Sequence, residues 1–142
     1  MNIYPVAQKN FSAALALLKK NNLPADDLTD ATHLFVLTDN GAVVGTVALE
    51  YSGQCGLLRS LCVDAKNRST GAGQRLIRFI EDYAKQNGVR DLYLLTTTAD
   101  KYFDKKGYTR IDRTAVPDEI KNTSEFASVC PSSAAVMKKQ LA

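Results

Sequence analysis

A short glycine-containing segment, placed between an apolar stretch and a long helical pattern, is the part of the sequence best suited to chemistry. It reads RSTGAG over residues 68–73 and follows the apolar residues 57–63. The first N–H groups of a helix have no intrahelical partner and lie at the positive end of its dipole, so they attract phosphate. Gly71 and Gly73 allow the backbone to come close to such a ligand, and the two residues before Gly71 add hydroxyl donors. The segment therefore predicts an anion site at a helix N-terminus.

The spacing of the glycines distinguishes this segment from the common nucleotide motifs. It does not match the dinucleotide fingerprint G-x-G-x-x-G, and it lacks the Gly-Lys-Ser/Thr ending of a P-loop. NAD and ATP are therefore poor candidates for the ligand. Coenzyme A is the candidate that remains.

Two motifs in the sequence resemble those of the GNAT acetyltransferases. Arg68-x-x-Gly71-x-Gly73 after an apolar strand is similar to the family's Q/R-x-x-G-x-G/A signature. Residues 99–108, ADKYFDKKGY, resemble its A-x-x-x-Y-x-x-x-G-F/Y segment and lie at the expected distance downstream. The order of the expected elements also matches over essentially all 142 residues. The resemblance implies a single-domain N-acetyltransferase that uses acetyl-CoA as its cosubstrate.

The resemblance also implies roles for individual residues. The backbone of Leu61, Cys62 and Val63 would bind the pantetheine arm, and the Leu61 N–H would polarise the thioester carbonyl as the oxyanion donor. Phe103, at the position of the family's tyrosine, would line the cofactor site. The diphosphate would be held by the amides of Arg68, Ser69, Thr70, Gly71, Ala72, Gly73 and Gln74.

Two positions depart from the family pattern where protons must move. Leu57 stands where many members have a carboxylate base, and Phe103 stands where they have a tyrosine proton donor. Glu50, expected almost opposite Gly56 on the neighbouring strand, is a candidate base, with a surface position as the alternative. Tyr102 is a candidate proton donor, with a packing role as the alternative, because adjacent helix positions point about 100° apart.

Arg59 and Ser60 interrupt an apolar strand close to where the acetyl group is expected. A guanidinium forms forked hydrogen bonds with carboxylate or phosphonate oxygens, so Arg59 is the candidate anchor for an anionic substrate. A structural ion pair is the alternative role for Arg59. An anchor of this kind favours a small anionic acceptor.

A narrower likeness involves three segments, 58–61 (LRSL), 94–99 (LLTTTA) and 126–134 (FASVCPSSA). They resemble the arsenic-resistance-associated N-acetyltransferases within the GNAT family, except that Thr96 replaces the usual asparagine. The likeness implies an amino-acid-like acceptor, with an arsenic- or phosphorus-containing analogue as one candidate.

Two other functions stay open. A CoA-binding module without catalysis would fit Leu57 and Phe103, since neither side chain can move a proton. A thiol-based arsenical binder would use Cys55, Cys62 and Cys130. The wide spacing of these cysteines instead favours buried free thiols and predicts no metal site.

Periodicity and turn signals predict a mixed α/β fold of about seven strands flanked by helices. The strands are expected at residues 1–6, 33–37, 42–51, 55–63, 92–98, 108–112 and 133–141, and the helices at 11–18, 71–87, 100–106 and 117–120. Asp39-Asn40-Gly41 is typical of a tight hairpin turn, and Gly88 of a helix end. Because the helix at 71–87 connects two strands, those strands should be parallel.

The composition is that of an ordinary globular chain. Of the 142 residues, 45% are hydrophobic and 23% are charged, which suits one domain with a single core. The formal net charge of +3 comes from scattered lysines and arginines, so no nucleic-acid partner is expected. The apolar stretches fall short of the roughly 20 residues that would cross a bilayer. The N-terminus lacks the features of a secretory signal, which predicts a cytoplasmic protein, with a homodimer as a candidate assembly.

Overall fold

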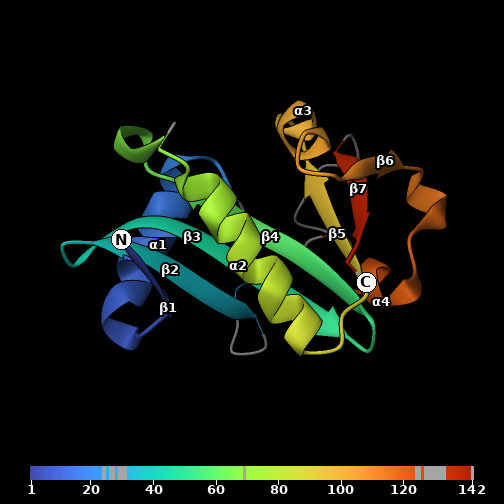
Figure 1. Ribbon diagram of the computed structural model, residues 1–142, viewed down its shortest axis with the longest axis horizontal. Coiled ribbons are helices and arrows are strands. Elements are labelled where there is room, and N and C mark those ends of the chain that lie inside the picture. Colours follow the sequence, from blue (N-terminus) through green and yellow to red (C-terminus); the bar gives the residue numbers. More distant parts are fainter. Residues whose placement is uncertain are drawn as a thin grey trace.

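One mixed sheet forms the centre of the molecule (Figure 1). The computed structural model describes residues 1–23, 25, 28, 32–68, 70–123, 126 and 134–141. Within these residues, seven strands pair in the order β1-β2-β3-β4-β5-β7-β6. Strands β4 and β5 are parallel, and the other neighbouring pairs are antiparallel. The predicted mixed sheet of about seven strands flanked by helices is confirmed.

The elements lie close to where the sequence predicts them. The strands are β1 (Asn2–Pro5), β2 (His33–Asp39), β3 (Ala42–Ser52), β4 (Cys55–Val63), β5 (Asp91–Thr96), β6 (Thr109–Ile111) and β7 (Ala135–Gln140). The helices are α1 (Gln8–Lys20), α2 (Ala72–Gln86), α3 (Asp100–Asp104) and α4 (Asp118–Lys121), with single 3-10 turns η1 (Ala65–Asn67) and η2 (Arg113–Ala115). Their ends differ from the predicted ends by a few residues, because capping and turn geometry decide the last residue of an element.

Local signals account for the two best-predicted features. The β2–β3 turn has Asn40 at φ 52° and Gly41 at φ 83°, and two successive left-handed residues are what a tight hairpin turn requires. Helix α2 buries an apolar stripe that includes Leu76 and Ile80, and Gly88 follows it at φ 85°. Both the turn and the helix end are therefore confirmed.

Helices cover both faces of the sheet. Figure 1 shows α2 in front of strands β2 to β4 and α1 behind them. On the α2 face, Leu76 and Ile80 belong to the main core cluster together with Leu49 of β3. On the α1 face, Leu18 packs in a cluster with Cys62 of β4. Strand β4 is therefore buried on both faces.

The parallel strands β4 and β5 separate soon after they begin. Their register pairs Cys55 with Asp91 and ends where Leu57 pairs with Tyr93. Strand β4 continues to Val63 without β5 beside it, while β5 remains paired with β7 along its whole length. Figure 1 shows the two strands diverging toward the end at which α3 lies. This divergence leaves one edge of β4, from residue 58 onward, without a neighbouring strand among the residues that the structure describes.

The other edge of β4 carries a β-bulge. Thr46 of β3 pairs with Cys62, but Ala48 pairs with Arg59, so one extra residue of β4 is accommodated between them. Ser60 is the extra residue, and its backbone is in the left-handed conformation, with φ 59°. The bulge resets the alternation of side chains, because Leu61 now contacts the α2 face and Cys62 the α1 face.

Candidate functional site

A cavity of about 940 Å³ opens where β4 and β5 separate. Its walls come from the residues just after α1 (21–23), from β4 (58–63), from the end of β5 and the segment that follows it (94–99), and from α3. Among its lining residues are the predicted site residues Arg59, Ser60, Leu61, Cys62, Val63, Arg68, Gly73, Tyr102 and Phe103.

The other predicted site residues lie outside this lining. Thr70, Gly71, Ala72 and Gln74 belong to the same turn and first helical residues as Gly73, which does line the cavity. Glu50 contacts Arg59 and is described below. Ser69 lies outside the described residues.

The glycine segment forms the N-terminus of α2. Gly71 is the N-cap residue, with φ 85°, and it makes no side-chain capping hydrogen bond. The first turn of the helix carries no acidic residue, so nothing there competes with a bound anion. The Thr70 hydroxyl donates to the Asn67 carbonyl at 2.5 Å and steadies the turn. The N–H groups at the start of α2 are therefore available to a phosphate.

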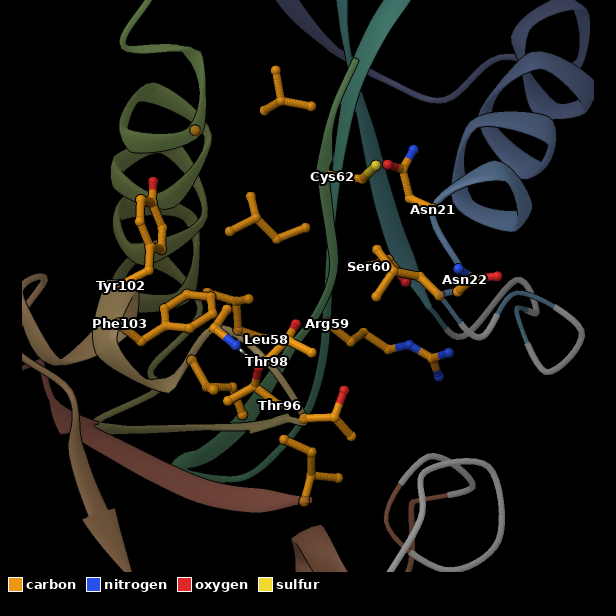
Figure 2. Close-up of a pocket in the computed structure, with 18 of the residues that line it drawn as sticks. Asn21, Asn22, Leu58, Arg59, Ser60, Cys62, Thr96, Thr98, Tyr102 and Phe103 are labelled. Atoms are coloured by element: carbon orange, nitrogen blue, oxygen red, sulfur yellow. Dashed lines mark hydrogen bonds between the residues drawn. The ribbon is translucent and has the colours of Figure 1, made fainter. Parts of the chain in front are cut away.

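Tyr102 lies over this helix start. A Cβ atom added to Gly73 would lie 2.7 Å from the Tyr102 hydroxyl oxygen, so only glycine leaves room for the ring as it stands. Lys106 lies 5.3 Å from the centre of the Tyr102 ring and donates to Gln74 Oε1 at 2.7 Å. Figure 2 shows the Tyr102 hydroxyl directed away from Arg59. Burial raises the pKa of Tyr102, which keeps the phenol protonated near neutral pH.

The two positions that lack a proton-transfer group are well packed. Phe103 is 6% exposed, lines the cavity and lies 5.6 Å from Tyr108 between ring centres. Leu57 is fully buried in the cluster that contains Tyr93 and Ile120. Both positions serve packing.

A second group of side chains lies on the opposite side of β4. In Figure 2, Arg59, Ser60 and Asn22 lie on the side that faces away from Tyr102 and Phe103. The cavity therefore reaches both faces of the sheet through the gap between β4 and β5. One side holds the glycine segment and the other side holds Arg59.

Arg59 is held by Glu50. Arg59 Nη1 donates to Glu50 Oε1 at 3.4 Å, and the Thr32 hydroxyl donates to the same oxygen at 3.1 Å. The Arg59 side chain is fully buried, and that of Glu50 is 19% exposed. Glu50 pairs with Leu57, one residue from the expected Gly56, so it shares a sheet face with Arg59 two residues further on. The ion pair that the sequence left as an alternative for Arg59 is present.

The end of α1 is a part of the site that the sequence did not predict. Arg68 Nη2 donates to Asn21 Oδ1 at 2.6 Å, and Arg68 Nε donates to the Val63 carbonyl at 3.2 Å. Asn22 adopts the left-handed conformation, with φ 59°. The pair Asn21-Asn22 signals a helix end in the sequence, but nothing local places it beside residue 68.

The described cysteines do not come together. Cys55 and Cys62 lie at opposite ends of β4, and seven strand residues span about 23 Å. Cys62 is buried against the Leu17 carbonyl, 3.9 Å from its Sγ, and burial raises the pKa of its thiol. Among the described residues, no group of three or more His, Cys, Asp or Glu side chains could hold a metal. Cys130 lies outside the described residues.

Solved structures share this architecture over the whole chain. N-acetylglutamate synthase from Neisseria gonorrhoeae, complexed with coenzyme A and N-acetyl-glutamate, superimposes with a TM-score of 0.85 at 19% identity, covering 99% of this chain and 35% of that one. Rv2747 from Mycobacterium tuberculosis, in complex with CoA, gives a TM-score of 0.84 at 19% identity and covers 100% of both chains. These likenesses define the fold as that of the GNAT acyl-CoA N-acyltransferases.

Sequence comparison gives the family. Residues 30–110, more than half of the 142 residues, match the acetyltransferase (GNAT) domain. The chain therefore belongs to the GNAT acetyltransferase family. It is also 28% identical, over 92 residues, to the amino-acid acetyltransferase of Ralstonia nicotianae. That match covers 63% of this chain and 20% of the relative, so the chain spans about a fifth of the relative's length.

A membrane-spanning helix is not found in the described part of the chain, since none of its helices is long and apolar enough.

Proposed function

We propose that this protein transfers the acetyl group of acetyl-CoA to the amine of a small, amino-acid-like acceptor that carries an acidic group. The observation that carries the proposal is the separation of β4 and β5 around a cavity that ends at the N-terminus of α2. The names of the relatives support an amino acid as the acceptor, because they include an amino-acid acetyltransferase and an N-acetylglutamate synthase.

The residues of the cavity fit a coenzyme A molecule. The N-terminus of α2 offers amides to a diphosphate, and Gly71 and Gly73 keep side chains out of its way. The free edge of β4 offers backbone groups to the amide-containing pantetheine arm, as an edge strand does to an added strand. We propose that residues 61–63 bind the arm and that residues 68–74 bind the diphosphate.

Acetyl-CoA supplies an activated acetyl group, so that the new C–N bond forms as the C–S bond breaks and the amine proton leaves with the thiol. The chain contributes position and polarity. Leu61 has no register partner on β3 and no β5 neighbour. We propose that its N–H stabilises the charge that develops on the acetyl oxygen.

We propose supporting roles for the two side chains that the sequence suggested for proton transfer. Glu50 lies outside the cavity lining, and its Oε1 accepts hydrogen bonds from Arg59 and Thr32. We propose that Glu50 positions Arg59; as a base it would have to act through water. The Tyr102 hydroxyl lies at Gly73, so we propose that it contacts the diphosphate end of the cofactor.

Arg59 is the proposed anchor for the acidic group of the acceptor. It lines the cavity on the side away from Tyr102 and brings a planar guanidinium to that wall. An Arg59→Lys variant keeps a positive charge near Glu50 but loses the forked geometry, so we expect KM for acidic acceptors to rise about tenfold. Arg78→Lys, an exposed position on α2, is the matched control.

Finer features of the function are also proposals. The likeness of segments 58–61 and 94–99 to arsenic-resistance-associated enzymes supports an arsenic- or phosphorus-containing amino acid as one acceptor. A cytoplasmic location and a homodimer stay proposals of the same kind. A thiol-based arsenical binder would lose metalloid binding when Cys62 and Cys130 are both replaced by serine.

A CoA-binding module without catalysis is the second candidate function. The buried Leu57 and Phe103 favour it, because they occupy the two positions where proton-transfer groups are usual. The module would bind acetyl-CoA tightly without turning it over.

One experiment separates the two functions. Purified protein is supplied with acetyl-CoA and a panel of amino acids, phosphonate and arsonate analogues, and matched amines without an acidic group. Thiol release is followed, and acetyl-CoA binding is measured by calorimetry. If the protein is the proposed enzyme, thiol release should be faster with acidic acceptors than with the matched amines. Tight binding without release from any member of the panel would support the module and contradict the enzyme.

A further inference from the structure

The hydroxyl group of Ser60 is buried inside the cavity wall without a partner. Ser60 is 8% exposed, and its Oγ has no hydrogen-bond partner among the described residues. Buried hydroxyl groups are nearly always hydrogen-bonded, because losing water without a replacement is unfavourable. Ser60 also lines the cavity between β4 and β5. A ligand in the cavity is therefore the natural partner for this hydroxyl.

The backbone at Ser60 is also unusual. Its φ of 59° lies in the left-handed region, which residues other than glycine and asparagine seldom adopt. The conformation is held in place by Thr46, a fully buried residue whose hydroxyl donates to the Ser60 carbonyl at 2.7 Å. Strained residues that are held in this way tend to occur at functional sites.

The bulge determines which way the hydroxyl faces. In a regular strand, Ser60 would lie on the opposite face from Arg59. Because Ser60 occupies the bulge, both side chains lie on the same side of β4, toward Asn22 and away from Phe103 (Figure 2). The bulge therefore places a buried hydroxyl on the same side of β4 as a buried guanidinium.

We propose that Ser60 determines specificity for the acidic end of the acceptor, by donating a hydrogen bond from its hydroxyl to an oxygen of the same acidic group that Arg59 binds. The proposal rests on the proposed acetyl transfer and adds a second contact to it. A hydroxyl and a guanidinium can both donate hydrogen bonds, which suits the oxygens at the anionic end of an amino acid. Hydrogen bonds to a charged oxygen are stronger than those between neutral groups.

The test compares the acidic acceptor that has the highest kcat/KM in the panel with its primary amide. The ratio of the two kcat/KM values measures recognition of the acid. In Ser60→Ala this ratio should fall by about 10- to 100-fold, mainly through KM of the acid. Ser60→Asn keeps a donor and tolerates the left-handed backbone, so it should recover part of the ratio.

A second variant separates binding from folding. Ser60→Gly removes the hydroxyl, so its ratio of kcat/KM values should fall as far as that of Ser60→Ala. Because glycine suits the left-handed backbone, the Tm of Ser60→Gly should stay at or above that of the wild type. Ser52→Ala, an exposed serine at the end of β3, is the control and should leave the ratio unchanged. Ratios like that of the wild type in both Ser60→Ala and Ser60→Gly would overturn the inference. Failure of the wild type to release thiol with any acceptor would instead overturn the proposed acetyl transfer.

Discussion

At the scale of single residues, Glu50 and Tyr102 are the two candidates for proton transfer, and the structure gives each of them another contact. Glu50 is linked to Arg59 and Thr32 through one carboxylate oxygen. Tyr102 places its hydroxyl at Gly73 and its ring beneath Lys106. A base or acid for catalysis would show in the pH profile, whereas a positioning group would not. Kinetics can therefore distinguish the two roles for each residue.

Glu50→Gln is expected to raise KM for acidic acceptors about tenfold, because Arg59 loses its charged partner. The shape of the kcat–pH profile should stay the same. If Glu50 is instead the base, kcat should fall about 100-fold and the acidic limb of the profile should disappear.

Tyr102→Phe is expected to weaken coenzyme A binding about fivefold, the effect of one lost hydrogen bond. Calorimetry gives the Kd, and kcat should change less than the Kd does. A large fall in kcat with unchanged binding, together with loss of the basic limb, would identify Tyr102 as the proton donor to the thiolate. Burial raises the pKa of Tyr102 above its ordinary value, so the phenol is protonated at neutral pH, as both roles require.

At the scale of elements, the site depends on how β4, α2 and α1 meet. The glycine turn starts α2 next to the free edge of β4, and Arg68 connects that turn to Asn21 at the end of α1. Gly53 and Gly71 offer a comparison, since both have positive φ (58° and 85°) and neither has an atom within 4 Å of an added Cβ. Gly53 lies in the β3–β4 turn, and Gly71 lies at the start of α2.

Gly71→Ala and Gly53→Ala should each lower the free energy of unfolding by about 1 kcal/mol, because alanine is strained at positive φ. Only Gly71→Ala should also weaken coenzyme A binding, since it moves the amides that bind the diphosphate. Urea unfolding and calorimetry measure the two effects. Equal coenzyme A affinities in the two variants would argue against a diphosphate site at this helix start.

At the scale of the whole molecule, the fold was more predictable than the site. The turn at Asn40-Gly41 and the apolar stripe of α2 are local patterns, and the parallel pairing of β4 with β5 follows from the helix between them. The bulge at Ser60 is not visible in the sequence, because a strand of this composition could run straight. The contacts of Glu50 with Thr32 and Arg59 join residues that are distant in sequence, so spacing alone could not reveal them.

Buried tyrosines should make the stability of the molecule fall at high pH. Burial, with the Asp91 carboxylate nearby, raises the pKa of Tyr93 from 10.0 to about 12. The unfolded chain then loses this proton near pH 10 while the folded chain keeps it, so stability falls as the pH rises from 10 to 12. Over this range the free energy of unfolding should fall by roughly 2 kcal/mol more in the wild type than in Tyr93→Phe. Urea unfolding measures this difference, and equal losses of unfolding free energy in the wild type and in Tyr93→Phe would contradict the raised pKa of Tyr93.

The most direct test of the account is a structure of the protein with acetyl-CoA bound. The account predicts the diphosphate at the first amides of α2, the pantetheine arm along residues 61–63 of β4, and the acetyl group near Leu61. The side of the cavity that holds Arg59 and Ser60 should stay open to the acceptor. Acetyl-CoA bound away from the gap between β4 and β5, or no binding at all, would contradict the central claim.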